Sequence, residues 1–259
     1  DLSGGARVAM SLALASSDIA GVFASSAAWP NEPQASVPIP IFGSAGSDDF
    51  NHQEMRTLDL ELKSPHRVLF FQGWHEWLPA EVATEGVEWM ELQAMRTGKR
   101  PKDPALIDAL FAQHVARAEK ETDPYRQFVL FTNLAADFKD FKDVSSYANK
   151  AAELKSRKEV RAATEADQKE DRRETQISDE VYRMRDRMAA SRTLKISELA
   201  NLRRQLKELS KQAQANEDSS ERRVARRVLT GFIASSRQIR DEQFQQLLQE
   251  VAPQQPRRE

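Results

Sequence analysis

Ser3 is the first residue whose setting could support catalysis. It stands in the string D-L-S-G-G, and Gly4 and Gly5 lead into a small, helix-favouring segment over residues 6–16. A nucleophilic serine on a sharp strand-to-helix turn needs small neighbours, because larger side chains would collide there. The backbone N–H of Gly4, at the start of that helix, could stabilise an oxyanion. A string such as S-G-G alone more often forms a flexible loop, so Ser3 needs support from other residues.

Two acids and one histidine stand at comparable places further along the chain. Asp48 and Asp49 follow an apolar run in F-G-S-A-G-S-D-D-F-N, and His75 follows another in F-F-Q-G-W-H-E-W. Functional groups of α/β proteins gather at the carboxyl ends of parallel strands. Simpler explanations exist for each residue, since an Asp can cap the next helix and a packed His can bond to a carbonyl.

The order Ser, Asp, His is more informative than any one of these strings. Each residue is predicted to follow a strand, with a helix after Ser3 and another between the acid and His75. In a serine hydrolase the histidine takes the proton of the serine, and a carboxylate orients the histidine. The other histidines lack such a setting, and we expect no catalytic role for His52, His66 or His114.

On these strings, residues 1–95 resemble the C-terminal half of an α/β hydrolase of the dienelactone-hydrolase and prolyl-oligopeptidase-like kind. S-G-G-A-R-V-A resembles the nucleophile turn with its helix, F-G-S-A-G-S-D-D-F-N the acid loop, and F-F-Q-G-W-H-E-W the histidine loop. The resemblance implies that Ser3 is the nucleophile, Asp49 the acid and His75 the base, with Asp48 as the alternative acid and Gly4 as an oxyanion donor. It implies cleavage of an ester or peptide-like acyl bond of a small-molecule substrate. The sequence has no metal-binding cluster and no phosphate-cradling loop, and we therefore expect no cofactor.

The elements that would position these residues alternate between helix and strand. Short apolar runs predict strands, and amphipathic segments predict helices. The strands are expected over residues 19–25, 37–42 and 67–72, and the helices over 6–16, 51–62 and 81–95. Buried parallel strands read as short continuous apolar runs. We therefore expect an α/β fold class for residues 1–96, as the C-terminal part of an α/β-hydrolase sheet.

The rest of the chain is predicted to be helical, because no Gly or Pro occurs in the 106 residues from Tyr125 to Thr230. Residues 97–123 are expected to form a linker and connecting helix, and 124–259 an all-α domain. Breaks are expected near 133–144 and 214–220. Helical hairpins are favoured over one long coiled coil, because the heptads do not keep register. The hairpins loosely resemble tetratricopeptide-type repeats, which implies a protein partner or packing on the first domain.

Composition excludes several kinds of site. Without Cys, the chain can form no disulfide, thiolate zinc site, iron–sulfur site or cysteine nucleophile. No apolar run approaches the roughly 18 residues that a membrane span needs. The net charge of −2 combines −9 over residues 1–95 with +7 over 96–259. The basic pairs of the second part are interleaved with acids, which favours solvated helix faces over nucleic-acid binding; they are Arg172-Arg173, Arg222-Arg223 and Arg226-Arg227. We expect no metal site.

The start of the chain weakens the hydrolase hypothesis. The first residue is Asp1, where the nucleophile turn usually has Gly, and the family's preceding strands and second oxyanion donor do not appear. The resemblance therefore predicts an N-terminally incomplete, inactive fragment of a serine hydrolase. The alternative is a non-catalytic interaction protein, with a degenerate hydrolase scaffold and a helical binding arm. Nothing in the sequence indicates a localisation.

Overall fold

A computed structural model describes residues 2–190 and 195–253 of the chain. Its described part contains one sheet of three parallel strands, in the order β1 (Val22–Ser25), β2 (Ile41–Gly46) and β3 (His66–Phe71). Leu2 makes a parallel bridge to Ser25 on the far side of β1. Because all the strands are parallel, the loops that follow them leave from the same edge of the sheet.

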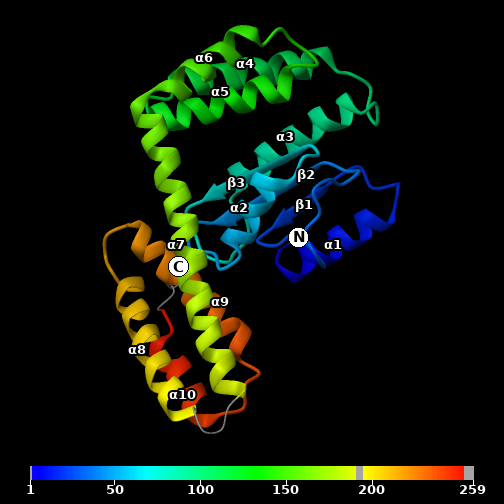
Figure 1. Ribbon diagram of the computed structural model, residues 1–259. Coiled ribbons are helices and arrows are strands. Elements are labelled where there is room, and N and C mark those ends of the chain that lie inside the picture. Colours follow the sequence, from blue (N-terminus) through cyan, green and yellow to red (C-terminus); the bar gives the residue numbers. More distant parts are fainter. Residues whose placement is uncertain (1, 191–194, 254–259) are drawn as a thin grey trace.

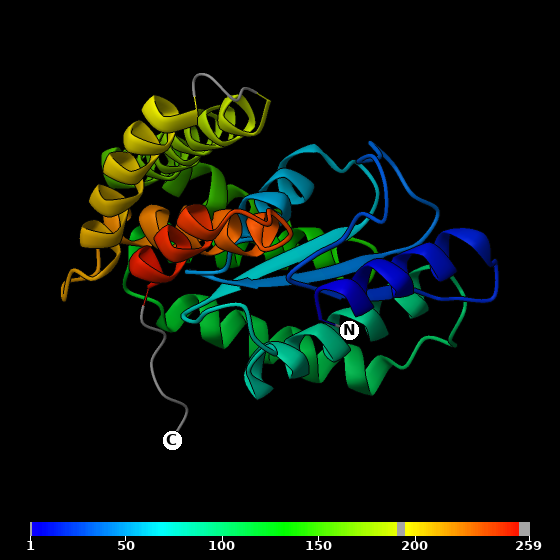
Figure 2. The ribbon, with the colours of Figure 1, turned by 90° about the horizontal axis from the view of Figure 1, so that it is seen from below.

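Helices cover the sheet on both sides, and Figure 2 shows α2 and α3 on opposite sides of it. The three helices nearest the sheet are α1 (Gly4–Ala15), α2 (His52–Glu61) and α3 (Ala80–Arg96). Met10 of α1 and Met55 of α2 join one apolar core with the strands. Gly86 lets α3 come close to the sheet, because a Cβ there would lie 2.5 Å from Phe23 and 2.8 Å from Phe42.

The predicted fold class is wrong. The sequence predicts an α/β class, the C-terminal part of an α/β-hydrolase sheet, followed by an all-α helical-hairpin region, but 65% of the residues that the structure describes are helical. Its described part has ten helices, and its three strands are only 4, 6 and 6 residues long. The strands expected over 19–25 and 67–72 overlap β1 and β3, but the one expected over 37–42 is wrong for residues 37–40, since β2 begins at Ile41. The three strands are too short and too few to set the architecture. Long amphipathic stretches without Gly or Pro dominate instead, and the protein is mostly helical.

Beyond α3 lies a layer of three helices (Figure 1). They are α4 (Pro104–Lys120), α5 (Pro124–Phe138) and α6 (Ser145–Ser156). Asp103 and Asp123 cap α4 and α5, and each cap precedes a proline, whose fixed φ suits the first turn of a helix. α4 lies inside the segment expected to be a linker and connecting helix, and it shares a core with α3 and α5. The division of the chain into domains stays a prediction.

A long helix, α7 (Lys158–Ala190), leads from this layer past α2 to a bundle (Figure 1). The bundle also contains α8 (Lys195–Ala213), α9 (Ser220–Ser236) and α10 (Glu242–Val251), which bury Leu206, Leu229 and Phe244 together. The helical content predicted for this part of the sequence is seen, since every described element from Pro104 onward is a helix. The gaps after α5 and α8 fall within the breaks expected near 133–144 and 214–220.

Candidate active site

Ser3 lies on a sharp turn between the sheet and helix α1. Its φ of 53° and ψ of −118° form a strained conformation that costs an L-residue roughly 1–3 kcal/mol. The N–H of Ser3 donates to the carbonyl of Ser25 at 2.8 Å, and the N–H of Arg7 donates to the carbonyl of Ser3 at 3.1 Å. With Leu2 bridged to β1 and α1 beginning at Gly4, this is the backbone of a strand-to-helix turn that presents a serine.

Gly4 begins α1, and its backbone N–H lies at the helix N-terminus. The first N–H groups of a helix have no partner within the helix, and the helix dipole favours negative charge there. Gly4 is also exposed, so a ligand can reach it. A Cβ on Gly4 would meet nothing within 4 Å, so the described surroundings do not require glycine at this position. Asp1, where the nucleophile turn usually has Gly, lies outside the described residues.

Asp49 and His75 form a hydrogen-bonded pair between two loops. Nδ1 of His75 lies 2.9 Å from Oδ1 of Asp49, whose side chain is fully buried. The N–H of Asn51 donates to the same oxygen at 2.8 Å, while Oδ2 of Asp49 is buried without a hydrogen-bond partner in the described residues. The ring of Phe50 stacks on the imidazole at 4.3 Å. A histidine held by Nδ1 on a carboxylate presents Nε2 as a base.

The two loops meet because the end of β2 is a glycine. A Cβ on Gly46 would lie 2.4 Å from the carbonyl oxygens of both Gly73 and Trp74. Two backbone hydrogen bonds join the loops: the Ser47 N–H donates to the Phe71 carbonyl at 2.8 Å, and the Asp48 N–H donates to the Gly73 carbonyl at 2.9 Å. The histidine loop therefore lies directly against the acid loop.

Asp48 and Asp49 have different partners although they are adjacent. Oδ2 of Asp48 accepts from Nη1 of Arg226 in α9 at 2.8 Å, so this carboxylate points toward the bundle. Only Asp49 bonds to His75. The geometry thus favours Asp49 over the alternative acid.

Ser3 stands at the same edge of the sheet as the pair, but it is not joined to it. The strand order places Ser3 beside the end of β1, Asp49 after β2 and His75 after β3. No hydrogen bond between Ser3 and His75 occurs in the described part of the chain. Catalytic hydrogen bonds are often long or open without substrate and form only in the complex.

The remaining histidines have structural settings. The ring nitrogens of His66 bond to the carbonyls of Ser64 and Asp59, at 2.7 and 3.0 Å. Burial lowers the pKa of His52 well below its ordinary value, and the nearby Arg227 lowers it further. Burial also lowers the pKa of His114, whose ring lies at the edge of a phenylalanine.

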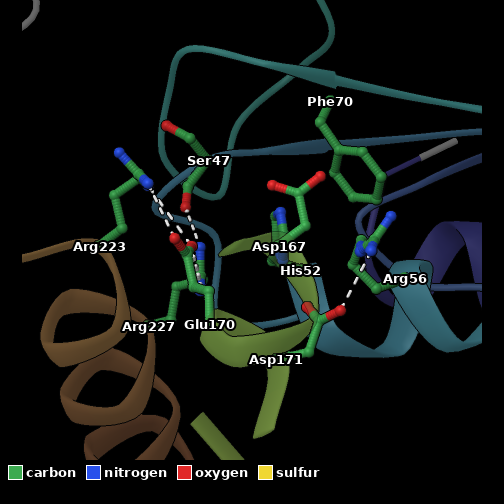
Figure 3. Close-up of a pocket in the computed structure, with 9 residues that line it drawn as sticks. All are labelled: Ser47, His52, Arg56, Phe70, Asp167, Glu170, Asp171, Arg223 and Arg227. Atoms are coloured by element: carbon green, nitrogen blue, oxygen red, sulfur yellow. Dashed lines mark hydrogen bonds and ion pairs between the residues drawn. The ribbon is translucent and has the colours of Figure 1, made fainter. Parts of the chain in front are cut away.

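A cavity of about 200 Å³ lies close by, between α2 and β3 on one side and α7 and α9 on the other (Figure 3). Arg227 is 1% exposed beside it and pairs with Glu174 at 2.7 Å and Glu170 at 2.8 Å. Burial would raise the pKa of Glu170, but its hydrogen bonds to Arg223 and Arg227 lower it to about 2. Burial raises the pKa of Glu174, and Arg227 opposes this. Each arginine that lines the cavity forms an ion pair with a carboxylate of α7. The charged residues of the cavity therefore neutralise one another and form an ionic interface.

Sequence reasoning missed the residues that support the pair. Trp74 and Trp77 stand on either side of His75 in the sequence, but Trp77 is 61% exposed and Phe50 makes the ring contact with the imidazole. The expectation of solvated basic faces is wrong for Arg226 and Arg227, whose guanidinium groups contact the acid loop. Alternating charge does not distinguish these residues from exposed ones. The sequence feature that could have indicated close packing of α9 on the acid loop is Gly231, which has no side chain and lies beside Phe50.

Comparison with protein-family models, curated proteins and solved structures gave no match that assigns the chain to a family. Within residues 2–190 and 195–253, no group of three or more His, Asp or Glu side chains is arranged to hold a metal ion. No helix in this part of the chain has both the length and the apolar character needed to cross a membrane.

Proposed function

We propose that the protein is a serine hydrolase that cleaves an ester or peptide-like acyl bond of a small molecule. The observation that carries this is the backbone of Ser3. In the described part of the chain, only Ser3 and Ser26 have positive φ among residues other than glycine, and Ser26 is fully buried. Strain of this kind persists where the surroundings enforce it, and it is concentrated at functional sites. The Asp49–His75 pair at the same sheet edge supports the same chemistry.

The chemistry follows from three groups. The hydroxyl oxygen of Ser3 attacks the substrate carbonyl while Nε2 of His75 takes its proton, and Asp49 stabilises the imidazolium through Nδ1. The N–H of Gly4 donates to the oxygen that becomes negative in the tetrahedral intermediate. His75 then gives the proton to the leaving alcohol or amine, and an acyl-enzyme remains. Water, deprotonated by His75, then attacks this ester. As the bond between the acyl carbon and the Ser3 oxygen breaks, His75 returns the proton to that oxygen, and the acid is released.

The helical part has no catalytic group in this scheme. The loose likeness to helical repeats supports a protein partner for it, which stays a proposal. The mechanism requires no cofactor.

A fluorophosphonate probe tests the function in the full-length natural protein, because it reacts only with an activated serine. Wild type should be labelled covalently, and Ser3→Ala should abolish labelling. His75→Ala should suppress it nearly as far, because an unassisted hydroxyl is a poor nucleophile. Ser17→Ala, which changes an exposed serine just after α1, is the matched control and should label like wild type.

A well-folded protein that takes up no probe would contradict the proposal and favour the interaction-scaffold alternative. Strong labelling of His75→Ala would show that Ser3 is activated by another group.

A further inference from the structure

The guanidinium group of Arg226, on helix α9, contacts both loops that carry the Asp49–His75 pair. Its Nη1 donates to Oδ2 of Asp48 at 2.8 Å, and its central carbon lies 5.0 Å from the ring centre of Trp74. These two residues directly precede Asp49 and His75. The Nε of Arg226 donates to the last carbonyl of α8 at 2.8 Å, so the bundle fixes the arginine in turn.

The same helix holds the acid loop at two further points. Nη1 of Arg227 donates to the carbonyl of Ser47 at 2.8 Å. Gly231 lies against Phe50, because a Cβ on this glycine would come within 3.3 Å of the Cβ of Phe50. Phe50 in turn stacks on the imidazole of His75 at 4.3 Å. One face of α9 therefore supports the backbone and a ring that together set the position of the imidazole.

We propose that helix α9 positions the Asp49–His75 pair and that it does so mainly through Arg226. This rests on the proposed function, since positioning matters only if His75 acts as a base. The Arg226–Asp48 pair is largely shielded from solvent, so removal of the arginine leaves a buried carboxylate without its partner and also lowers stability. Because this side chain bridges two loops, it also acts on the distance and angle between the groups those loops carry. Proton transfer depends on that geometry, and displacement by about 1 Å can cost on the order of 100-fold in rate.

The proposal also couples the helical bundle to the reaction. Release of α9 from the loops removes the contacts at Asp48, Trp74 and Phe50 together. A protein that binds the bundle and moves α9 would therefore lower the activity without touching Ser3.

The test compares Arg226→Ala with Arg223→Ala. Arg223 lies on the same helix and pairs with Glu170 and Asp218 at 2.8 Å, and neither partner lies on the acid loop or the histidine loop. Two quantities are measured on the full-length protein: the rate of fluorophosphonate labelling, and the proton NMR signal of His75 Nδ1–H, assigned with His75→Gln. The second reports the hydrogen bond to Asp49 without needing activity.

We expect Arg226→Ala to slow labelling on the order of 10- to 100-fold and to shift or broaden the His75 signal. Arg223→Ala should change neither. Arg226→Lys keeps a charge for Asp48 but loses the planar contact with Trp74, so its rate should fall between those of wild type and Arg226→Ala. The lysine variant also provides the comparison if the alanine variant does not fold.

Two results would overturn the proposal. One is a folded Arg226 variant with the labelling rate and the His75 signal of wild type. The other is an equal loss of both in Arg223→Ala, which would indicate general destabilisation. If wild type itself is not labelled, the proposed function fails, and the NMR signal alone then decides whether Arg226 positions the pair.

Discussion

Two adjacent carboxylates, Asp48 and Asp49, have different partners and different tasks. Asp49 is fully buried and bonds to His75 at 2.9 Å, whereas Asp48 bonds to Arg226 at 2.8 Å. One short loop therefore serves both the site and the interface with α9. Because each carboxylate has its own partner, the effects of changing Asp48 and of changing Asp49 can be measured independently.

We predict that Asp49→Asn slows fluorophosphonate labelling far more than Asp48→Asn does. An amide at position 49 can hold His75 in the wrong tautomer, which costs on the order of 10⁴-fold in comparable triads. An amide at position 48 can still accept a hydrogen bond from Arg226. Labelling rates of the two variants at neutral pH measure the difference. A larger loss in Asp48→Asn would reverse the assignment of the acid.

At this scale the sequence pointed to the three residues of the candidate site, and their catalytic roles stay a prediction. The strings around Ser3, Asp49 and His75 indicated serine chemistry, because their order and their places after apolar runs were visible. The choice of Asp49 over Asp48 came only from resemblance. The stacking of Phe50 and the bridge made by Arg226 could not be predicted, since they depend on residues that are up to 178 positions apart.

Among the elements, strand β2 decides how close the acid and histidine loops come. A Cβ on its last residue, Gly46, would lie 2.4 Å from two carbonyl oxygens, and backbone atoms cannot move aside cheaply. A Cβ on Gly43 of the same strand would instead lie 2.6 Å from the end of the Met55 side chain and 3.1 Å from a methyl group of Val68, so its nearest contacts are side chains and not backbone atoms. A thioether chain is flexible and can shift.

Gly46→Ala should therefore separate the loops, slow labelling strongly and lower the free energy of unfolding by about 1–3 kcal/mol. Gly43→Ala is the matched control and should retain labelling with a smaller loss of stability. Urea unfolding and labelling of the two variants give both quantities. Normal labelling of Gly46→Ala would show that the close approach of the loops does not matter.

The sequence located most helices and strands but overestimated how much of the architecture the strands determine. The apolar run before Gly73 marked β3 to within one residue, whereas the run expected over 37–42 shares only residues 41 and 42 with β2, which continues through Gly43 to Gly46. The stretch without Gly or Pro marked the helices. The fold class was wrong because local strand signals were extended to a whole sheet. The described part of the chain has three strands of at most 6 residues and ten helices, so the protein is mostly helical.

For the whole molecule, the defining feature is the buried ionic interface between α7 and α9, which also reaches the sheet region through the carbonyl of Ser47. Arg227 is buried between Glu170, Glu174 and the carbonyl of Ser47. The pKa of Glu170 is lowered to about 2 from an ordinary 4.5, through Arg223 and Arg227 and despite its burial. The alternating charges of α7 and α9 could not reveal this, because such patterns are equally typical of solvated helices.

The interface should make stability depend on pH in the acid range. Because the folded pKa of Glu170 lies below its ordinary value, its contribution is complete above about pH 4.5 and is lost as the pH falls toward 2. Between pH 7 and pH 3 wild type should lose about 2 kcal/mol more of its free energy of unfolding than Glu170→Gln. The pKa of Glu174 is raised, so this group makes the protein more stable as the pH falls, opposite to Glu170, and it is present in both wild type and Glu170→Gln.

Urea unfolding at the two pH values provides this comparison. Asp167, Asp171 and His52, which face the same cavity, are present in both proteins. The measured difference therefore reports the charge of Glu170, including its effect on the pKa of His52 and of Glu174, both of which it raises. Equal losses in wild type and Glu170→Gln would mean that the carboxylate does not stabilise the packing of α9 on α7.

The central claim, that Ser3 is an activated nucleophile, is tested most directly by locating the covalent adduct. The full-length natural protein is treated with a limiting amount of fluorophosphonate, digested with trypsin and analysed by mass spectrometry. We predict that the phosphonyl group lies on Ser3, in the peptide that ends at Arg7, and that His75→Ala removes it. A folded protein that carries no adduct on Ser3, or carries it on another serine, would contradict the claim.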